Sequence, residues 1–179
     1  MREDTRTRIQ EIALRLFTEQ GYEATSLREI AEELGVTKAA LYYHFKTKDD
    51  IVASLVDLHV AEIDNLVEWA KTQPKTPEMR RELLERYAAN LRGPRHIEMA
   101  RFLERNQTAL REHPKLSRMR DMMIELTRQM NEPGATPVER ISRSLALFAL
   151  HAGRWLPGDL TEDEVDKASM EVARRLLEL

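Results

Sequence analysis

Apolar residues recur at intervals of three and four along almost the whole chain, and this spacing is the strongest constraint on its fold. Ile9, Ala13 and Phe17, for example, would line one face of a single helix. A period of about 3.6 residues is typical of amphipathic helices. No segment alternates apolar and polar residues among β-branched and aromatic side chains, which is the pattern of a strand. The sequence therefore predicts an all-α protein.

Glycine and proline divide the chain into its expected helices. The six glycines and seven prolines fall at the ends of the apolar segments. The expected helices cover approximately residues 9–20, 27–34, 38–44, 48–69, 78–92, 95–112, 115–131, 138–156 and 161–179. Nine helices with short connections predict a nine-helix bundle.

The composition excludes several classes of protein. Charged residues make up 33% and apolar residues 42% of the 179 residues, which is unlike a disordered chain. The longest apolar run, Leu145 to Leu150, has six residues, whereas a membrane span needs about 20. There is no cysteine, so disulfides and Cys-ligated metals are excluded. We expect a cytoplasmic protein without a membrane partner.

The segment from residue 26 to residue 48 contains the most informative local pattern. Ser26 and Glu29 are spaced as a capping box at the start of a short helix. Gly35 follows where the end of that helix needs a left-handed residue, and Thr37 can cap the next helix. Two helices separated by such a tight turn predict a helix-turn-helix.

The second helix of this unit has an outward face unlike that of a solvated helix. It carries Lys38, Ala39, Tyr42, Tyr43 and His44. From Thr37 to Lys48 there are three lysines and no carboxylate. In a DNA major groove, a lysine can donate to guanine and a methyl group can contact thymine. Hydroxyl groups and the amides at the helix start can reach phosphate oxygens.

Each of these features also has an ordinary structural explanation. Lys46 and Lys48 could be solvated surface lysines, and Tyr42 and Tyr43 could be packing residues. Helix-turn-helix geometry also occurs in proteins that never contact DNA. The alternative to a DNA-binding protein is therefore a helical ligand-binding or protein-interaction bundle that does not bind DNA.

A set of short motifs between residues 9 and 55 indicates a family. The motifs are Ala13-Leu14-Arg15-Leu16-Phe17, Gly21-Tyr22, Thr25-Ser26, Ile30-Ala31, Leu34-Gly35-Val36 and Leu41-Tyr42-Tyr43-His44-Phe45-Lys46-Thr47-Lys48. This segment resembles the DNA-binding domain of the TetR family of bacterial regulators.

The resemblance implies a homodimer of two-domain chains whose third helix reads DNA. Residues 1–48 would be the helix-turn-helix DNA-binding domain, and residues 49–179 the helical effector-binding and dimerisation domain. By position, the resemblance implies operator contacts from Ser26, Arg28, Thr37, Lys38, Ala39, Tyr42, Tyr43, His44 and Lys48.

The last two expected helices are apolar on more than one face. A helix of this kind buries one face in its own subunit and needs cover for the other. The two helices are either deeply buried or form a patch that pairs with a second copy of the chain. We predict a homodimer interface that includes Leu145, Phe148, Ala152, Val165, Val172 and Leu176.

The middle of the chain is rich in methionine and aromatic residues. Methionine adapts to the shape of a ligand and suits an apolar pocket. At helical spacing, however, such residues ordinarily form a core, so both explanations stay open. The candidate effector-binding residues are Trp69, Tyr87, Met99, Phe102, Met122, Met123, Phe148 and His151.

These features together predict a sequence-specific transcriptional regulator. We expect a homodimeric repressor on a palindromic operator, relieved by a small-molecule effector. The sequence has no His-Glu-x-x-His or Gly-x-Ser-x-Gly motif, and its five histidines are scattered. We therefore expect no enzymatic activity, no metal and no cofactor.

Overall fold

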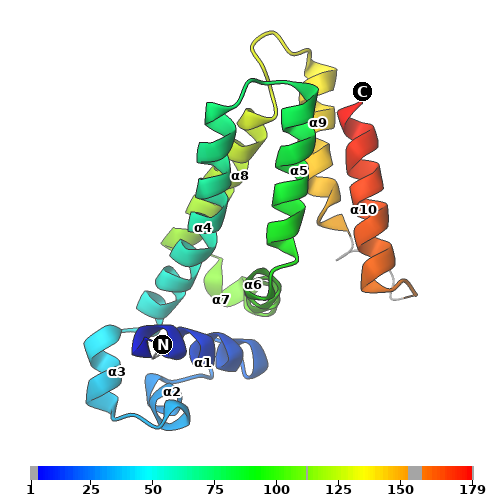
Figure 1. Cartoon of the computed structure of the whole chain (residues 1–179). Helices are drawn as coiled ribbons and strands as arrows, with labels where there is room; N and C mark the ends of the chain where they lie inside the picture. The colour runs from blue at the N-terminus through cyan, green and yellow to red at the C-terminus, as the bar shows by residue number, and fades with distance from the viewer. Residues whose placement is uncertain (1–3, 112, 153–158, 179) are drawn as a thin grey trace. The chain divides into compact units, whose positions relative to one another are not determined.

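The computed structural model describes residues 4–111, 113–152 and 159–178, and in these ranges it contains helices and no strand (Figure 1). The helices are α1 (Thr5–Glu19), α2 (Leu27–Leu34), α3 (Lys38–His44), α4 (Lys48–Thr72), α5 (Pro77–Leu91), α6 (Pro94–Arg105), α7 (Gln107–Leu110), α8 (Pro114–Gln129), α9 (Pro137–Ala149) and α10 (Glu162–Leu177). The predicted all-α class is confirmed. None of these helices is long and apolar enough to span a membrane.

The first three helices share a small apolar core. α1 packs against α2, and α2 packs against α3. Ile9, Phe17, Ile30 and Leu41 are completely buried between them. Burying a side chain of this size contributes roughly 1.5–3 kcal/mol. This core holds α3, which is only seven residues long, against α2.

The segment predicted as one helix over residues 95–112 is two helices. α6 and α7 meet at Asn106, whose φ of −111° and ψ of 21° are not helical. The Asn106 side chain is buried and bonds to the backbone of Phe17 and Tyr22. We attribute the break to these distant bonds, which a local pattern does not reveal. The described residues therefore contain ten helices, where nine were predicted.

α9 is shorter than the helix predicted over residues 138–156. It ends at Ala149, and the chain then tightens into a turn in which the His151 N–H donates to the Phe148 carbonyl at 3.0 Å. Such tighter turns are frequent at helix ends. Trp155, in the predicted last turn, lies outside the described residues.

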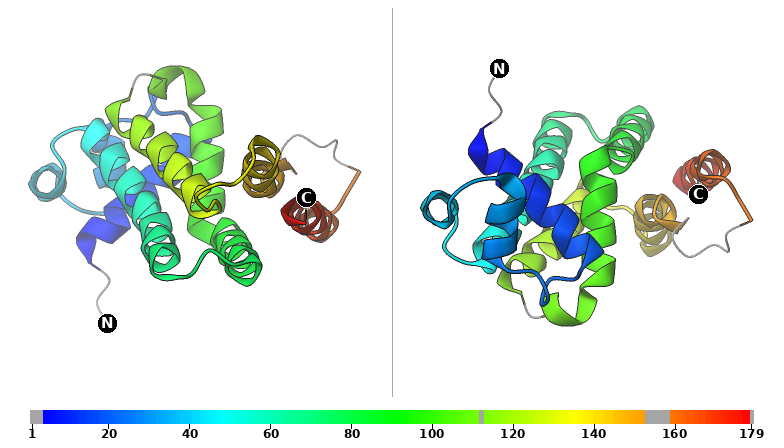
Figure 2. Two further views of the ribbon diagram at one scale, coloured as in Figure 1. Left: turned by 90° about the horizontal axis from the view of Figure 1, so that it is seen from above. Right: turned by 90° about the horizontal axis from the view of Figure 1, so that it is seen from below.

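The chain forms two compact units, to both of which α4 and α8 contribute. The first unit comprises Met1–Ala61 and Gly93–Arg120, and the second Glu62–Arg92 and Asp121–Leu179. In the first unit α1 packs against α6, and in the second α10 packs against α5 and α9. Figure 2 shows α9 and α10 side by side. The functional boundary predicted between residues 48 and 49 stays a prediction.

Two buried arginines hold the start of α9 in the second unit. Arg80 pairs with Glu132 and donates from Nε to the Met130 carbonyl at 2.9 Å. Arg143 pairs with Glu132 at 3.1 Å and with Glu139 at 3.0 Å. Buried charges are tolerated where they are paired and hydrogen-bonded. The shared carboxylate of Glu132 therefore joins α5 to α9.

Candidate nucleic-acid interface

The turn between α2 and α3 has the geometry that the sequence predicts. The Ser26 hydroxyl accepts the Glu29 N–H at 3.2 Å, and the Glu29 carboxylate accepts the Ser26 N–H at 2.7 Å. Gly35 has a φ of 72°, a left-handed conformation that glycine adopts without steric cost. The Val36 N–H donates to the Ala31 carbonyl at 3.0 Å and closes the end of α2. These bonds fix how the chain enters α3.

α3 buries one side and exposes the other. Thr37 caps it by accepting the Ala40 N–H at 3.2 Å. Leu41 points into the core and is fully buried, whereas Tyr43 is 81% exposed. The other predicted DNA contacts on this segment are exposed at Thr37, Lys38 and Ala39, and half-buried at Tyr42 and His44. The structure thus gathers the predicted recognition residues on or beside one outward face.

Contacts between neighbouring side chains organise this outward face. Lys38 Nζ lies 5.3 Å from the centre of the Tyr42 ring, within the range of a cation–π interaction. The rings of Tyr43 and His44 meet edge to face at 5.2 Å. The face therefore presents positive charge and polar aromatic edges together.

Two further cations lie at the C-terminal end of α3. Arg6 donates to the His44 carbonyl at 3.4 Å and lies 4.3 Å from the centre of the Phe45 ring. Lys46 Nζ donates to the Tyr42 carbonyl at 2.6 Å. Cations at this end satisfy orphan carbonyls and complement the helix dipole. The sequence analysis missed Arg6, because it lies 38 residues before its partner His44.

Ser26 and Arg28 lie at the exposed start of α2. The Ser26 oxygen is used as a cap acceptor, but its O–H can still donate to a phosphate. Arg28 donates from Nε to Glu32 at 2.7 Å. A guanidinium has five N–H donors, so this exposed pair leaves most of them for another acceptor.

Lys48 lies in the first turn of α4, where the loop between α1 and α2 holds its ammonium. Lys48 Nζ donates to the carbonyls of Tyr22 at 2.6 Å and Glu23 at 3.2 Å, and lies 4.5 Å from the Tyr22 ring centre. An ammonium has three N–H donors, so its charge and one donor remain for a phosphate. Lys48 therefore ties the α1–α2 loop to α4, whatever it does to DNA.

The Tyr22 side chain strengthens the same tie. Its hydroxyl donates to a carboxylate oxygen of Asp49. Burial, followed by this hydrogen bond, raises the pKa of Tyr22 well above its ordinary value. The phenol therefore stays protonated and keeps donating at any physiological pH.

A capping arrangement fixes the link from α3 to α4. The N–H groups of Lys46 and Thr47 donate to one Asp50 carboxylate oxygen at 3.0 and 2.9 Å. The Asp50 N–H donates to the Thr47 hydroxyl at 3.0 Å. Hydrogen bonding, first of all with Thr47, lowers the pKa of the Asp50 carboxyl. The link is therefore held by an ionised carboxylate.

Residues 9–55, which include this whole helix-turn-helix, match the family model for bacterial regulatory proteins of the TetR family. The likeness to the TetR family is therefore shown for this N-terminal segment, about a quarter of the chain. The HTH-type transcriptional regulator AcrR of Shigella flexneri is 42% identical over 76 residues, which cover 42% of this chain and 35% of AcrR. The HTH-type transcriptional regulator SAUSA300_2515 of Staphylococcus aureus is 50% identical over 48 residues, covering 27% of this chain and 26% of that protein. The chain thus spans about a third or less of the length of these curated relatives.

The likeness to solved TetR-type structures extends over nearly the whole fold. Mycobacterium smegmatis AmtR has a TM-score of 0.71 and 26% identity, covering 97% of this chain and 87% of AmtR. A TetR/AcrR-family regulator from Thermobifida fusca has a TM-score of 0.63 and 26% identity, covering 98% and 97% of the two chains. The chain therefore resembles TetR-family proteins in sequence near its N-terminus, and solved regulators in fold over the rest of its length.

The predicted effector residues fall in both units. In the second unit, the Tyr87 hydroxyl lies 2.7 Å from His151 Nε2 and 3.3 Å from Met123 Sδ. Met122 is buried on α8, and the Arg86 guanidinium lies 4.2 Å from the Trp69 ring centre. The structure thus brings Tyr87, Met123 and His151 together as a cluster. Their predicted role in ligand binding stays a prediction.

Met99 and Phe102, the other buried candidates, belong to the first unit. Both lie on α6 and are almost completely buried. The Phe102 ring is 5.8 Å from that of Phe17 on α1. In the first unit they form part of the core between α1 and α6.

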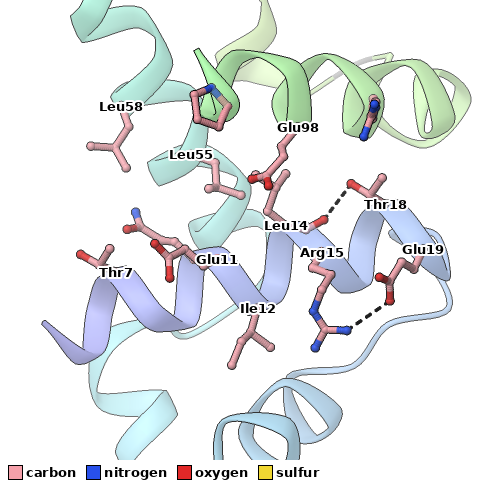
Figure 3. A pocket seen from close by; sticks show the side chains of 13 residues that line it. Thr7, Glu11, Ile12, Leu14, Arg15, Thr18, Glu19, Leu55, Leu58 and Glu98 are labelled. Carbon is pink, nitrogen blue, oxygen red and sulfur yellow. Dashed lines mark hydrogen bonds and ion pairs between the residues drawn. The ribbon is translucent and has the colours of Figure 1, made fainter. Parts of the chain in front are cut away.

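A hollow of about 810 Å³ lies in the first unit between α1, α4 and α6 (Figure 3). Leu14, Leu55 and Leu58 contribute apolar surface, and Glu11 and Glu98 contribute carboxylates. None of the described residues that line it was predicted as an effector contact. The sequence analysis missed this hollow because its walls come from three helices that are distant in the chain.

Two of the predicted dimer residues, Leu145 and Phe148, lie on an exposed apolar stripe of α9. Ala152 follows the end of α9, and the other three lie on α10. Val138, Ile141, Leu145 and Phe148 on α9 are 66%, 61%, 48% and 54% exposed. Val172 and Ala152 are also exposed, whereas Val165 and Leu176 are half-buried. Four large apolar side chains in one stripe form an unusual surface for a monomer. Phe148, predicted for both roles, lies on this stripe.

Proposed function

We propose that this chain is a sequence-specific transcriptional repressor that acts as a homodimer and is relieved by a small-molecule effector. The carboxylate-free outward face of α3 carries the proposal. Lys38 and Tyr43 are exposed there, and the capped turn at Gly35 holds the helix in place. We take residues 1–48 as the DNA-binding domain and residues 49–179 as the effector-binding and dimerisation domain, acting in the cytoplasm.

The residues of α3 match the chemistry of a major groove. Lys38 can donate to guanine oxygen and nitrogen acceptors, and the Ala39 methyl group can contact thymine. The hydroxyls of Thr37 and Tyr43 can donate to phosphates, which position the protein without reading sequence. We assign His44, Tyr42, Ser26, Arg28 and Lys48 to the same interface, with Lys48 on a phosphate.

The apolar stripe on α9 supports the homodimer. A second copy is the partner whose surface matches Ile141, Leu145 and Phe148 by symmetry, since a two-fold interface pairs a patch with itself. A dimer also places two copies of α3 on half-sites about 34–36 Å apart, or a multiple of that distance. We infer that the operator is palindromic for this reason.

The continuous helix α4 supports regulation by an effector. It begins at Lys48 beside α3 and supplies residues to both units. A ligand that contacts the Tyr87, Met123 and His151 cluster would pair an apolar body with a group that hydrogen-bonds to the phenol or imidazole. A coupling of about 1–3 kcal/mol would change operator affinity roughly 5- to 150-fold.

The DNA-binding proposal is tested by a gel shift at two salt concentrations. The probe is the DNA upstream of the chain's own gene, compared with a scrambled fragment of equal length. We expect preferential binding to a palindrome in the upstream fragment, weakening as salt rises because phosphate contacts release counterions. Absence of binding to every fragment at low salt would instead support the non-DNA-binding bundle.

The effector proposal is tested by screening compounds in a thermal-shift assay and then on the bound operator. We expect compounds that raise the melting temperature to release DNA. A compound that binds at the Tyr87 cluster and raises the melting temperature, yet leaves operator affinity unchanged, would contradict the proposal that a ligand at this cluster relieves repression.

A further inference from the structure

The side chain of Asn106, at the corner between α6 and α7, caps two helices at once. Its Nδ2 donates to the Phe17 carbonyl at 3.0 Å in the last turn of α1, and to the Phe102 carbonyl at 2.9 Å in α6. Its Oδ1 accepts the Tyr22 N–H at 2.6 Å. The Phe17 carbonyl belongs to the last turn of α1, where carbonyls lack an intrahelical partner, and the Tyr22 N–H lies in the loop that follows. The Phe102 carbonyl also accepts the Asn106 backbone N–H at 3.1 Å. One buried amide thus satisfies backbone groups on α1, the α1–α2 loop and α6.

Tyr22 carries this connection on to α4. On one side its N–H is held by Asn106, and on the other its carbonyl accepts Lys48 Nζ and its hydroxyl donates to Asp49. Lys48 and Asp49 form the first turn of α4, directly after the link from α3. The ring of Tyr22 is also packed edge to face on Phe17 at 5.2 Å. Tyr22 therefore cannot shift without moving the start of α4 or breaking these bonds.

We propose that Asn106 is a positioning residue for DNA recognition, although it lies far outside the segment that would touch DNA. It holds the α1–α2 loop, the loop holds Lys48, and Lys48 sets the start of α4 beside the recognition helix. This inference rests on the proposed DNA-binding function. It extends the machinery for operator binding to the α6–α7 corner.

The bonding of Asn106 explains why aspartate or alanine would not serve there. Asparagine supplies two N–H donors and a carbonyl acceptor on one short planar group. Aspartate would keep the acceptor for Tyr22 but lose both donors, and alanine would lose all three bonds. A buried N–H or carbonyl left without a partner is costly, so either change should release the loop.

The test compares Asn106→Ala with the full-length wild type on DNA that the wild type selects from a random pool. We expect both chains to be equally helical by circular dichroism, and the Tyr22 amide to exchange hydrogen faster in the variant. Affinity for the selected DNA should fall roughly fivefold or more. The salt slope and the base preference should stay unchanged, because no DNA contact is removed.

A matched control and a double-mutant cycle separate positioning from general stability. Asn131→Ala removes a similar bond, from Asn131 Nδ2 to the Thr127 carbonyl at 2.9 Å in the second unit, and should change affinity by less than about twofold. In a Lys48→Met background, Asn106→Ala should lose much of its effect because both changes break one connection. Full additivity, or an equal loss in Asn131→Ala, would overturn the proposal.

Asn106→Ser keeps the test decisive if Asn106→Ala fails to fold, since a hydroxyl can still donate or accept without burying a charge beside the two carbonyls. It should still lower affinity, and unchanged affinity with fast Tyr22 exchange would refute the positioning role. A wild type that selects no DNA would contradict the proposed function itself. A wild type that binds, with both Asn106 variants binding equally well, would contradict only this inference.

Discussion

The exposed faces of α3 and α9 are opposite in chemistry. α3 presents lysine, threonine and tyrosine without a carboxylate, whereas α9 presents valine, isoleucine, leucine and phenylalanine. The first face keeps its hydrogen-bonding groups in water until a polyanion replaces that water. The second gains only when another apolar surface covers it. The side-chain chemistry is therefore the basis on which we propose DNA as the partner of the first face and a second copy of the chain as the partner of the second.

The largest expected effect is the loss of the dimer on charging the α9 face. Leu145→Glu with Phe148→Glu would place carboxylates where two copies meet, and unpaired buried charges cost several kcal/mol. We expect the dimer dissociation constant to rise at least about 100-fold, measured by sedimentation equilibrium. Arg140→Glu on an exposed position of the same helix is the control. A double variant that stays dimeric would remove the contrast between the two faces.

A smaller effect is expected from truncating the α3 face. Lys38→Ala or Tyr42→Ala should weaken operator binding by about 1–3 kcal/mol and change which bases are preferred. The measurement is binding to the operator and to its single-base variants, with random DNA in parallel. Equal losses on operator and random DNA would show that these side chains do not read bases.

Lys48 should behave differently from the residues of α3. Lys48→Met is expected to weaken binding to all sequences alike and to reduce the slope of log affinity against log salt by about 0.9, the value of one phosphate. Titrations at several salt concentrations give this slope. Weaker binding with an unchanged slope would mean that Lys48 only ties the α1–α2 loop to α4.

The smallest expected effect is a change in stability on removing the carboxylate caps at the starts of α4 and α9. Asp50 in the first turn of α4 and Glu139 in the first turn of α9 both have lowered carboxyl pKa values, owing chiefly to hydrogen bonds with Thr47 and Thr136. A carboxyl whose pKa is lower in the folded than in the unfolded state stabilises the fold at pH values above its unfolded-state pKa. This stabilisation is lost as the pH falls through the folded-state pKa. Asp50→Asn and Glu139→Gln should each lower the melting temperature slightly near neutral pH, because both groups are exposed and screened by solvent, and should leave it unchanged in strong acid. Melting temperatures measured down the pH scale check this, and a loss that persists in acid would contradict it.

The helix-turn-helix could be predicted almost to the residue because its signals are local. Ser26, Glu29, Gly35 and Thr37 act on backbone groups within a few positions of themselves, and each has the predicted contact or conformation. The apolar stripe of α9 could also be predicted from the sequence, because its residues lie on one helix. Local signals do not show what covers a face, so the partner had to be inferred from chemistry.

The features that the sequence analysis missed depend on distant contacts. Asn106 lies inside an apparently regular helical pattern, and its partners Tyr22 and Phe17 are 84 and 89 residues away. Lys48 could be chosen from the sequence as a cation for DNA contact. Its bonds to the α1–α2 loop could not be predicted, because they depend on how α1 and α4 pack. No pattern in one segment reveals such bonds, because they exist only once the segments have met.

The double cap at Asn106 also has a consequence for how the protein is made. A ribosome adds roughly 5–20 residues each second, so the 84 residues from Tyr22 to Asn106 take about 4–17 s to synthesise. α3 is synthesised within that interval, while the α1–α2 loop behind it has no cap. Fragments that end before residue 106 would lack this cap, so under the proposed function they should bind the operator less tightly than the full-length chain.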